Sequence, residues 1–209
     1  MFLSSIFFSD KKEPCWDDSE WVAMIKKGDD KAFEQLFFRY HKELSHFANS
    51  ITRSREFARD AVQDVFLKIW RNRENWEIQV SIKAYLYQSV RNQSLNLLEK
   101  QYTRLRIIDE YQSEQQGQKI YSVTRELIPD DISDEEQVLI RKIWKIVDRM
   151  PDRRRMVFEL NRKHGLSYKE VAKVLDISRK TVENHVANAL QDIRDELQAK
   201  GFTKIFKKV

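Results

Sequence analysis

Apolar residues recur at steps of three and four along much of the chain, the spacing that places them on one face of an α-helix. The first series is Phe33, Leu36, Phe37, Tyr40, Leu44, Phe47, Ala48 and Ile51; the second is Phe57, Ala61, Val62, Val65, Phe66, Ile69 and Trp70; the third is Ile82, Tyr85, Leu86, Val90, Leu97 and Leu98. The intervening RNRENWEIQVS lacks this spacing and is predicted to be a loop or a short extended stretch. We therefore expect at least three helices to share a core between about residues 17 and 100.

The helical spacing weakens between Gln101 and Glu136, where polar residues predominate and Gly117 and Pro129 interrupt the chain. A stretch without its own apolar face is expected to be a flexible linker, although YTRLRIIDEY is compatible with an extension of the preceding helix. The spacing returns with Val138, Ile143, Ile146, Val147 and Met150. This series stops at Pro151 and three further segments follow, so the spacing of helix breakers predicts four helices in about 65 residues.

We therefore predict an all-α fold of two small helical domains joined by a flexible linker. No strand-like alternation and no internal repeat is present. The expected boundaries are 1–16 for an N-terminal tail, 17–105 for the first domain, 106–136 for the linker, 137–198 for the second domain and 199–209 for a basic C-terminal tail.

Composition agrees with this organisation. The 209 residues include only 4 glycines and 3 prolines, which favours helices over a turn-rich β fold. No apolar run reaches the roughly 18 residues that a membrane span needs, so no membrane insertion is predicted. The opening MFLSSIFFSDKK lacks the basic n-region of a signal peptide. A cytoplasmic location is the simplest expectation.

Catalytic and metal chemistry finds little support in the residues. Cys15 is the only cysteine, which excludes an internal disulfide framework and gives no support to a cysteine-based zinc site. His41 and His46 are five residues apart, no HExxH is present, and these two histidines are expected at the surface or at the boundary of the core. With so few glycines, no phosphate-binding loop is available. We predict no enzyme, no catalytic residue, no metal, no cofactor and no small-molecule substrate.

Charge is distributed unevenly along the chain, whose formal net charge is +5. Residues 130–136 (DDISDEE) carry five acids and no base, whereas residues 153–189 carry nine Lys or Arg against four acids. A nucleic-acid site is therefore expected in the C-terminal third of the chain. The acidic stretch suggests the hypothesis that it mimics nucleic acid and restrains DNA binding by the basic domain.

The strongest local motif is GLSYKEVAKVLDISRKTVENHVANAL, residues 165–190. Ser167 and Glu170 form the spacing of a capping box that opens a helix. Asp176, Ile177 and Ser178 supply a tight turn with an apolar residue at its centre. The following helix is expected to bury Val182, Val186, Leu190 and Ile193. Two short helices joined in this way are typical of a helix-turn-helix.

The second helix of this motif has a polar face that suits the major groove of DNA. Its predicted DNA-binding residues are Arg179, Lys180, Thr181, Glu183, Asn184, His185 and Asn188. Arg and Lys suit guanine edges or phosphates, and Asn pairs with adenine. The alternative is an ordinary solvated helix surface. The capping box, the turn with its apolar central residue and the basic charge together favour DNA binding over that alternative.

The first domain carries an acidic pair. Asp60 and Asp64 lie one helical turn apart in REFARDAVQDVFLKIW, with Phe66 and Trp70 nearby as possible anchors for a basic partner surface. An acidic solvated stripe beside a core face is an equally good interpretation of the local pattern.

Aromatic, amide and basic residues alternate after this pair, as single-stranded bases require for stacking and backbone neutralisation. They are Trp76, Tyr85, Tyr87, Arg91, Asn92, Lys100, Arg104 and Arg106. Most aromatics at helical spacing belong to a core, so only one or two are expected to touch a base.

Taken together, the two halves resemble the sigma-70 superfamily of bacterial transcription initiation factors, in its extracytoplasmic-function (ECF) group. The resemblance covers roughly residues 20–105 and 137–198. Segment ARDAVQDVFLKIW resembles the polymerase-binding helix, SIKAYLYQSVRNQSLNLLEK the segment that captures the promoter −10 element, and the C-terminal unit the −35-reading domain. The resemblance implies a non-enzymatic factor that joins core RNA polymerase, selects a promoter and helps open it.

The resemblance also implies roles for particular residues. Asp60, Asp64, Val65 and Phe66 match the positions that dock on the clamp helices of the β′ subunit, and the C-terminal domain implies a contact with the β flap. The positions implied for the −10 element are Trp76, Tyr85, Arg91, Asn92, Asn96, Lys100 and Arg104. Asn96 stands where many members have Asp, and the usual run of arginines after it is thinned. An anti-sigma factor is a further implied partner.

A stand-alone regulator is the main alternative, because LSYKEVAKVLDISRKTVENHV also resembles the output domain of LuxR-type transcription factors. Such proteins carry a receiver or sensing domain of alternating strands and helices, which residues 17–100 do not predict. A helical bundle that binds only proteins is a third possibility, against which the basic helix-turn-helix argues.

Overall fold

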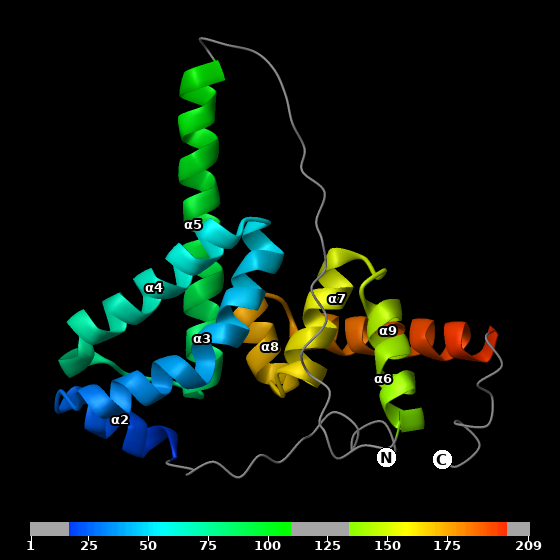
Figure 1. Cartoon of the computed structure of the whole chain (residues 1–209), viewed down its shortest axis with the longest axis horizontal. Coiled ribbons are helices and arrows are strands. Elements are labelled where there is room, and N and C mark those ends of the chain that lie inside the picture. Colours follow the sequence, from blue (N-terminus) through cyan, green and yellow to red (C-terminus); the bar gives the residue numbers. More distant parts are fainter. Residues whose placement is uncertain (1–16, 110–133, 200–209) are drawn as a thin grey trace. The chain divides into compact units, whose positions relative to one another are not determined.

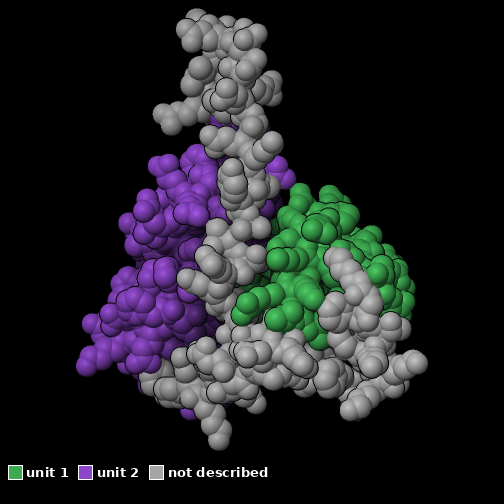
Figure 2. Space-filling model, turned by 45° about the vertical axis from the view of Figure 1, so that its right-hand side comes forward, with its two compact units in different colours: residues 1–13, 121–209 green, residues 14–120 purple. Residues whose placement is uncertain are grey.

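The computed structural model describes residues 17–109 and 134–199, and it places side chains at 17–102 and 138–199. Within these ranges all regular structure is helical, which confirms the predicted all-α class (Figure 1). The chain divides into two compact units, one within Pro14–Ile120 and one containing Tyr121–Val209 (Figure 2). Of the acidic stretch 130–136, residues 130–133 lie outside the described residues, as do the side chains of 134–136.

The first unit is built mainly from α3, α4 and α5, which pack against one another in pairs. Its elements are α2 (Asp18–Lys26), α3 (Asp30–Thr52), α4 (Arg55–Arg71), the short 3₁₀ helix η1 (Arg73–Asn75) and α5 (Ile82–Asp109). The stretch predicted as a loop thus begins with a 3₁₀ turn. Arg53 adopts the left-handed conformation (φ 56°) and ends α3, so that α4 can turn back along it.

Aromatic rings join α3 to α4. The Phe33 ring lies 6.0 Å from that of Phe66 and 4.8 Å from that of Trp70, and Phe37 meets Phe66 at 5.0 Å. On the α5 side, Tyr87 is fully buried and its hydroxyl donates to Glu43 Oε2 at 3.2 Å. The apolar series predicted from spacing therefore does form one shared core.

The first turn of α5 is capped from a distant part of the chain. The Ile82 backbone N–H donates to Asp18 Oδ2 of α2 at 2.8 Å, while Ser81 Oγ accepts from the Ala84 N–H at 3.1 Å. Two of the free N–H groups at the start of α5 are thereby satisfied, and α2 is tied to α5.

The far half of α5 stands apart from this core. Among the side chains of α5 that the structure describes, Ser94 is the last buried one, and none from 95 to 102 is buried. Figure 1 shows this end of α5 projecting beyond α3 and α4. The helix thus carries its later side chains on an open surface.

The second unit forms its core where α6 and α7 pack against α9. Its elements are α6 (Asp134–Val147), α7 (Asp152–Phe158), the π-helical turn η2 (Glu159–Lys163), α8 (Tyr168–Leu175) and α9 (Arg179–Ala199). The main cluster contains Leu139, Ile143, Ile146, Val147, Met150, Phe158, Ala189, Ile193 and Leu197. Trp144 covers its edge, with its ring 6.3 Å from Phe158 and beneath the Lys163 ammonium.

Glu159 gives the second unit a pH-dependent stability. Burial raises the pKa of Glu159, and the neighbouring charges of Lys163 and Arg155 offset this only in part. A raised pKa in the folded state means that the folded protein binds the proton more tightly, so stability falls as pH rises from the ordinary glutamate pKa through the folded value.

We therefore expect Glu159→Gln to raise the melting temperature of the full chain at pH 7. The gain should shrink toward zero near pH 4, where the wild-type carboxyl is protonated in both states. Thermal unfolding followed by helical circular dichroism across this pH range measures it. A gain that is equal at both ends, or a loss at pH 7, would contradict the assignment.

Candidate DNA- and polymerase-binding surfaces

The helix-turn-helix of the second unit is built by local capping. Ser167 Oγ accepts from the Glu170 N–H at 3.3 Å and Glu170 Oε2 accepts from the Ser167 N–H at 2.8 Å, which confirms the predicted capping box. Asp176 takes the left-handed conformation (φ 55°) and ends α8. Ile177 is half-buried in the turn, and Ser178 Oγ accepts from the Thr181 N–H at 3.0 Å to open α9.

The buried face of α9 fixes which side chains remain available. Val182, Val186 and Ala189 are buried, as are Val171 and Val174 of α8, which packs against it. Of the predicted DNA-binding residues, the exposed ones are Arg179, Lys180, Asn184 and Asn188, and the half-buried ones are Thr181, Glu183 and His185. All seven therefore lie outside the core, on α9.

One carboxylate pairs with both cations at the start of α9. Glu183 Oε1 lies 3.2 Å from Arg179 Nε, and Glu183 Oε2 lies 3.6 Å from Lys180 Nζ. The two basic side chains are 71% and 78% exposed, so these pairs are weak and readily exchanged for other partners. The first turn of α9 thus presents two cations that are only weakly paired with a neighbouring carboxylate.

Several other basic residues of this unit serve its structure. Arg154 pairs with Asp192 and thereby links α7 to α9, and Arg149 pairs with Glu196 at 3.2 Å. Arg155 donates to Asp152 and to the Asp148 carbonyl. The excess of basic residues counted in the sequence of this unit is therefore larger than the number of cations that its surface offers to DNA.

On α4 the acidic pair is accessible, but its apolar neighbours are not. Asp64 is exposed and Asp60 half-buried, whereas Val65 and Phe66 are 5% and 2% exposed. Val65 and Phe66 point into the core, where Phe66 meets Phe33 and Phe37, and their docking on a partner stays a prediction.

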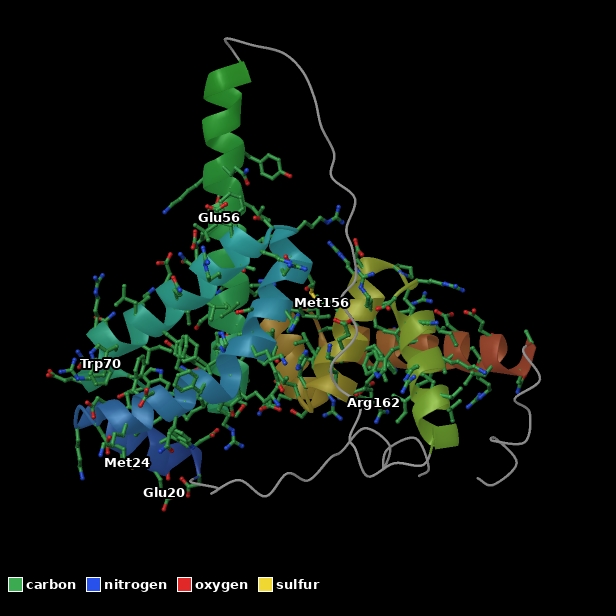
Figure 3. All side chains as sticks on the ribbon, viewed as in Figure 1. Glu20, Met24, Glu56, Trp70, Met156 and Arg162 are labelled. Atoms are coloured by element: carbon green, nitrogen blue, oxygen red, sulfur yellow. The ribbon has the colours of Figure 1, made fainter. Side chains whose placement is uncertain are left out.

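Two exposed residues extend this face of α4 and were missed in the sequence. Glu56 lies four residues before Asp60 and is exposed, so Glu56, Asp60 and Asp64 share one line along the helix (Figure 3 labels Glu56). Leu67, three residues after Asp64, is 45% exposed. The available signal was helical spacing: Glu56 lies four residues before Asp60, and Leu67 lies three after Asp64.

Along α5 the predicted DNA-binding residues separate into two groups. Trp76 precedes the helix and is 4% exposed, with its ring 5.9 Å from that of the half-buried Tyr85. The −10 role of Trp76 stays a prediction, and its burial leaves little of the ring open to a base.

The second group remains open. Asn92, Asn96 and Lys100 are exposed and four residues apart, which places them on one face of α5. Arg91 is half-buried and donates to Asn92 Oδ1 at 3.3 Å. Arg104 lies in α5, but its side chain is outside the described ones. Tyr102, 67% exposed, is an aromatic residue on this projecting end that the sequence did not single out.

Among residues 17–109 and 134–199, no cluster of histidine, cysteine or acidic side chains is arranged to hold a metal ion. His41 and His46 are exposed, as predicted. In the same ranges, no helix is both long and apolar enough for a membrane span.

Two family models match this chain. The model described as "Sigma-70 region 2" matches residues 36–104, and "Sigma-70, region 4" matches residues 140–193, so that together they cover more than half of the chain. The first matches α3 to α5 and the second matches the unit with the helix-turn-helix.

Similar proteins include RNA polymerase sigma factors of the ECF group. The chain is 26% identical over 182 residues to the ECF RNA polymerase sigma-E factor of Escherichia coli K12, covering 87% of this chain and 94% of that protein. Its identity to the sigma-E factor of Haemophilus influenzae is 27% over 186 residues, covering 87% and 95%.

Solved structures share the fold. The sigma factor RpoE of Bartonella quintana, in complex with the anti-sigma factor NepR, gives a TM-score of 0.55 at 21% identity, covering 80% of this chain and 98% of that one. CnrH in complex with the cytosolic domain of CnrY gives 0.52 at 20% identity, covering 87% and 97%.

An all-α chain with a sigma-70 region 2 followed by a region 4 is a transcription initiation factor. The chain belongs to the sigma-70 family, in its ECF group. The LuxR-type alternative is not favoured, because the first unit also matches a sigma-70 region.

Proposed function

We propose that this sigma factor binds core RNA polymerase through α4, holds the promoter −10 strand on α5 and reads the −35 duplex with α9. The observation that carries the proposal is the exposed polar face of α9, the second helix of a capped helix-turn-helix, in one unit, while α4 of the other unit presents a line of acidic side chains. The factor contributes binding and selection, and no catalytic step is assigned to it.

The polymerase contact rests on charge. Asp64 is exposed and Asp60 partly so, and carboxylates on a rigid helix suit a basic partner surface. Val65 and Phe66 hold α4 against α3 from beneath and therefore fix the direction in which the acids point. A clamp helix of the β′ subunit is the proposed partner, and the second unit is proposed to meet the β flap.

The −10 contact rests on the open face of α5. Asn92 and Asn96 offer amide donors and acceptors to base edges, and Lys100 a cation to the backbone. Tyr85 is only half-buried and is the remaining candidate for stacking among the aromatic residues predicted here.

The −35 contact follows from α9. Arg179 and Lys180 stand at the exposed start of the helix, where free N–H groups also favour a phosphate. Asn184 and Asn188 lie one turn apart and suit adenine edges in the major groove. His185 and Thr181 flank them at half-buried positions.

Co-elution of the full chain with core RNA polymerase on gel filtration tests the proposal. We expect a complex at moderate salt that initiates transcription at a −35/−10 promoter selected from a randomised library. Free elution beside core of proven activity would overturn it and favour a stand-alone regulator.

We further propose an anti-sigma factor as regulator, since RpoE of Bartonella quintana was solved with one bound. The site of action is proposed to be the cytoplasm, where a polymerase partner and promoter DNA are found.

Glu183→Gln is expected to raise the affinity of the protein for non-specific duplex DNA by about three- to tenfold at low salt. The change removes the negative charge that pairs with Arg179 and Lys180, so both cations become free for phosphates. Fluorescence anisotropy with random duplex, over a salt series, measures it. Asp195→Asn, on the later part of the same helix, is the matched control. Equal gains for the two variants would show only a general charge effect.

A further inference from the structure

A side-chain hydrogen bond connects the line of acids on α4 to α5, the helix proposed to hold the −10 strand. Gln93 Nε2 donates to Asp64 Oδ2 at 2.8 Å, between residues 29 apart in the chain. Asp64 is exposed and Gln93 half-buried. The bond therefore joins the proposed polymerase surface to the proposed −10 surface.

The position of Gln93 explains how it can serve both surfaces. The next residue, Ser94, is fully buried in the bundle, and the preceding one, Asn92, is exposed. Gln93 thus stands at the border between the core and the open face of α5. A change in how α5 lies on α4 would have to break or move this bond.

We infer that Gln93 is a positioning residue, which holds the Asp64 carboxylate in its polymerase-binding orientation and fixes the open face of α5 against α4. The inference rests on the proposed function. A carboxylate has about four acceptor sites, so Asp64 accepts from Gln93 and still offers its remaining lone pairs to a cation of the partner. A hydrogen bond to an ionised acceptor is also stronger than a neutral one.

A double-mutant cycle measures the bond directly. We expect Gln93→Leu to weaken core polymerase binding by about three- to tenfold, because Asp64 then samples several rotamers. In the background of Asp64→Ala, Gln93→Leu should have no further effect, since the group it orients is gone. Gln88→Leu makes the same exchange at another half-buried site on α5 and should leave binding unchanged.

A charge swap tests the part that concerns α5. Gln93→Glu places a second carboxylate against Asp64 and is expected to weaken −10 strand binding by the holoenzyme about threefold or more. Adding Asp64→Asn should restore that affinity. The amide at position 64 then donates to the carboxylate at position 93, which reverses the direction of the wild-type hydrogen bond. Fluorescence quenching of a single-stranded −10 oligonucleotide by the assembled holoenzyme gives the readout.

Each result bears on the inference. Additive effects of Gln93→Leu and Asp64→Ala, equal binding of Gln93→Leu and wild type, or failure of the swap to rescue would overturn it. Unchanged core binding by Asp64→Ala itself would instead overturn the proposed polymerase site. Melting temperatures of all variants separate these outcomes from unfolding, and the swap remains decisive if Gln93→Leu lowers stability.

Discussion

Asp64→Lys is expected to weaken binding to core RNA polymerase by about 30- to 100-fold while leaving the fold intact. The substitution removes an exposed carboxylate and presents a cation to the partner surface, which is proposed to be basic; this costs about 2–3 kcal/mol at a protein interface. Its effect on stability should be small, because Asp64 is exposed on α4. Titration of labelled protein with core polymerase measures the affinity.

Glu34→Lys is the matched control for this experiment. It reverses an exposed acidic charge on α3, outside the line formed by Glu56, Asp60 and Asp64. Core affinity close to wild type is expected for Glu34→Lys, with −35 duplex binding preserved in both variants. Equal losses for the two variants would mean that net charge, and not the face of α4, determines binding.

The double variant Arg179→Ala with Lys180→Ala is expected to reduce promoter binding by about 30- to 1,000-fold and to spare core binding. Each lost contact with a base edge or phosphate costs about 1–3 kcal/mol. The slope of the logarithm of DNA affinity against the logarithm of salt concentration should also become shallower by up to about two, if both cations meet phosphates. Filter binding of holoenzyme to −35 duplex over a salt series measures both quantities.

Lys145→Ala with Arg194→Ala removes the same number of positive charges from the second unit. Both residues are exposed, one on α6 and one on the later part of α9. Their loss should change promoter affinity by less than about threefold. Simultaneous loss of core and promoter binding by the Arg179/Lys180 variant would point to misfolding instead.

Features set by neighbouring residues could be predicted from the sequence. The capping box of Ser167 and Glu170 and the opening of α9 at Ser178 depend on side chains that reach only three residues along the chain, so their spacing sufficed. The shared core of the first unit followed from helical periodicity alone. The capping residues position α9 for its proposed DNA contact, and the shared core positions α5 for its own.

The contact residues were harder to assign, for physical reasons that differ from one residue to the next. Val65 and Phe66 belong to the apolar series of α4, and this periodicity, which indicated burial, outweighed their match to a family interface. Trp76 lies in a loop without periodicity, so nothing local told core from surface. The Gln93–Asp64 bond joins helices distant in the sequence, and no spacing rule reaches that far.

The cap that Asp18 gives to Ile82 bears on how the protein emerges from the ribosome. The acceptor belongs to the first described helix, and the amide that it serves is synthesised 64 residues later. During translation the Asp18 carboxylate therefore lacks this hydrogen-bond partner until the start of α5 has left the exit tunnel. The bond between α2 and α5 can form only then, and we expect a nascent chain arrested before this point to expose α2 to protease.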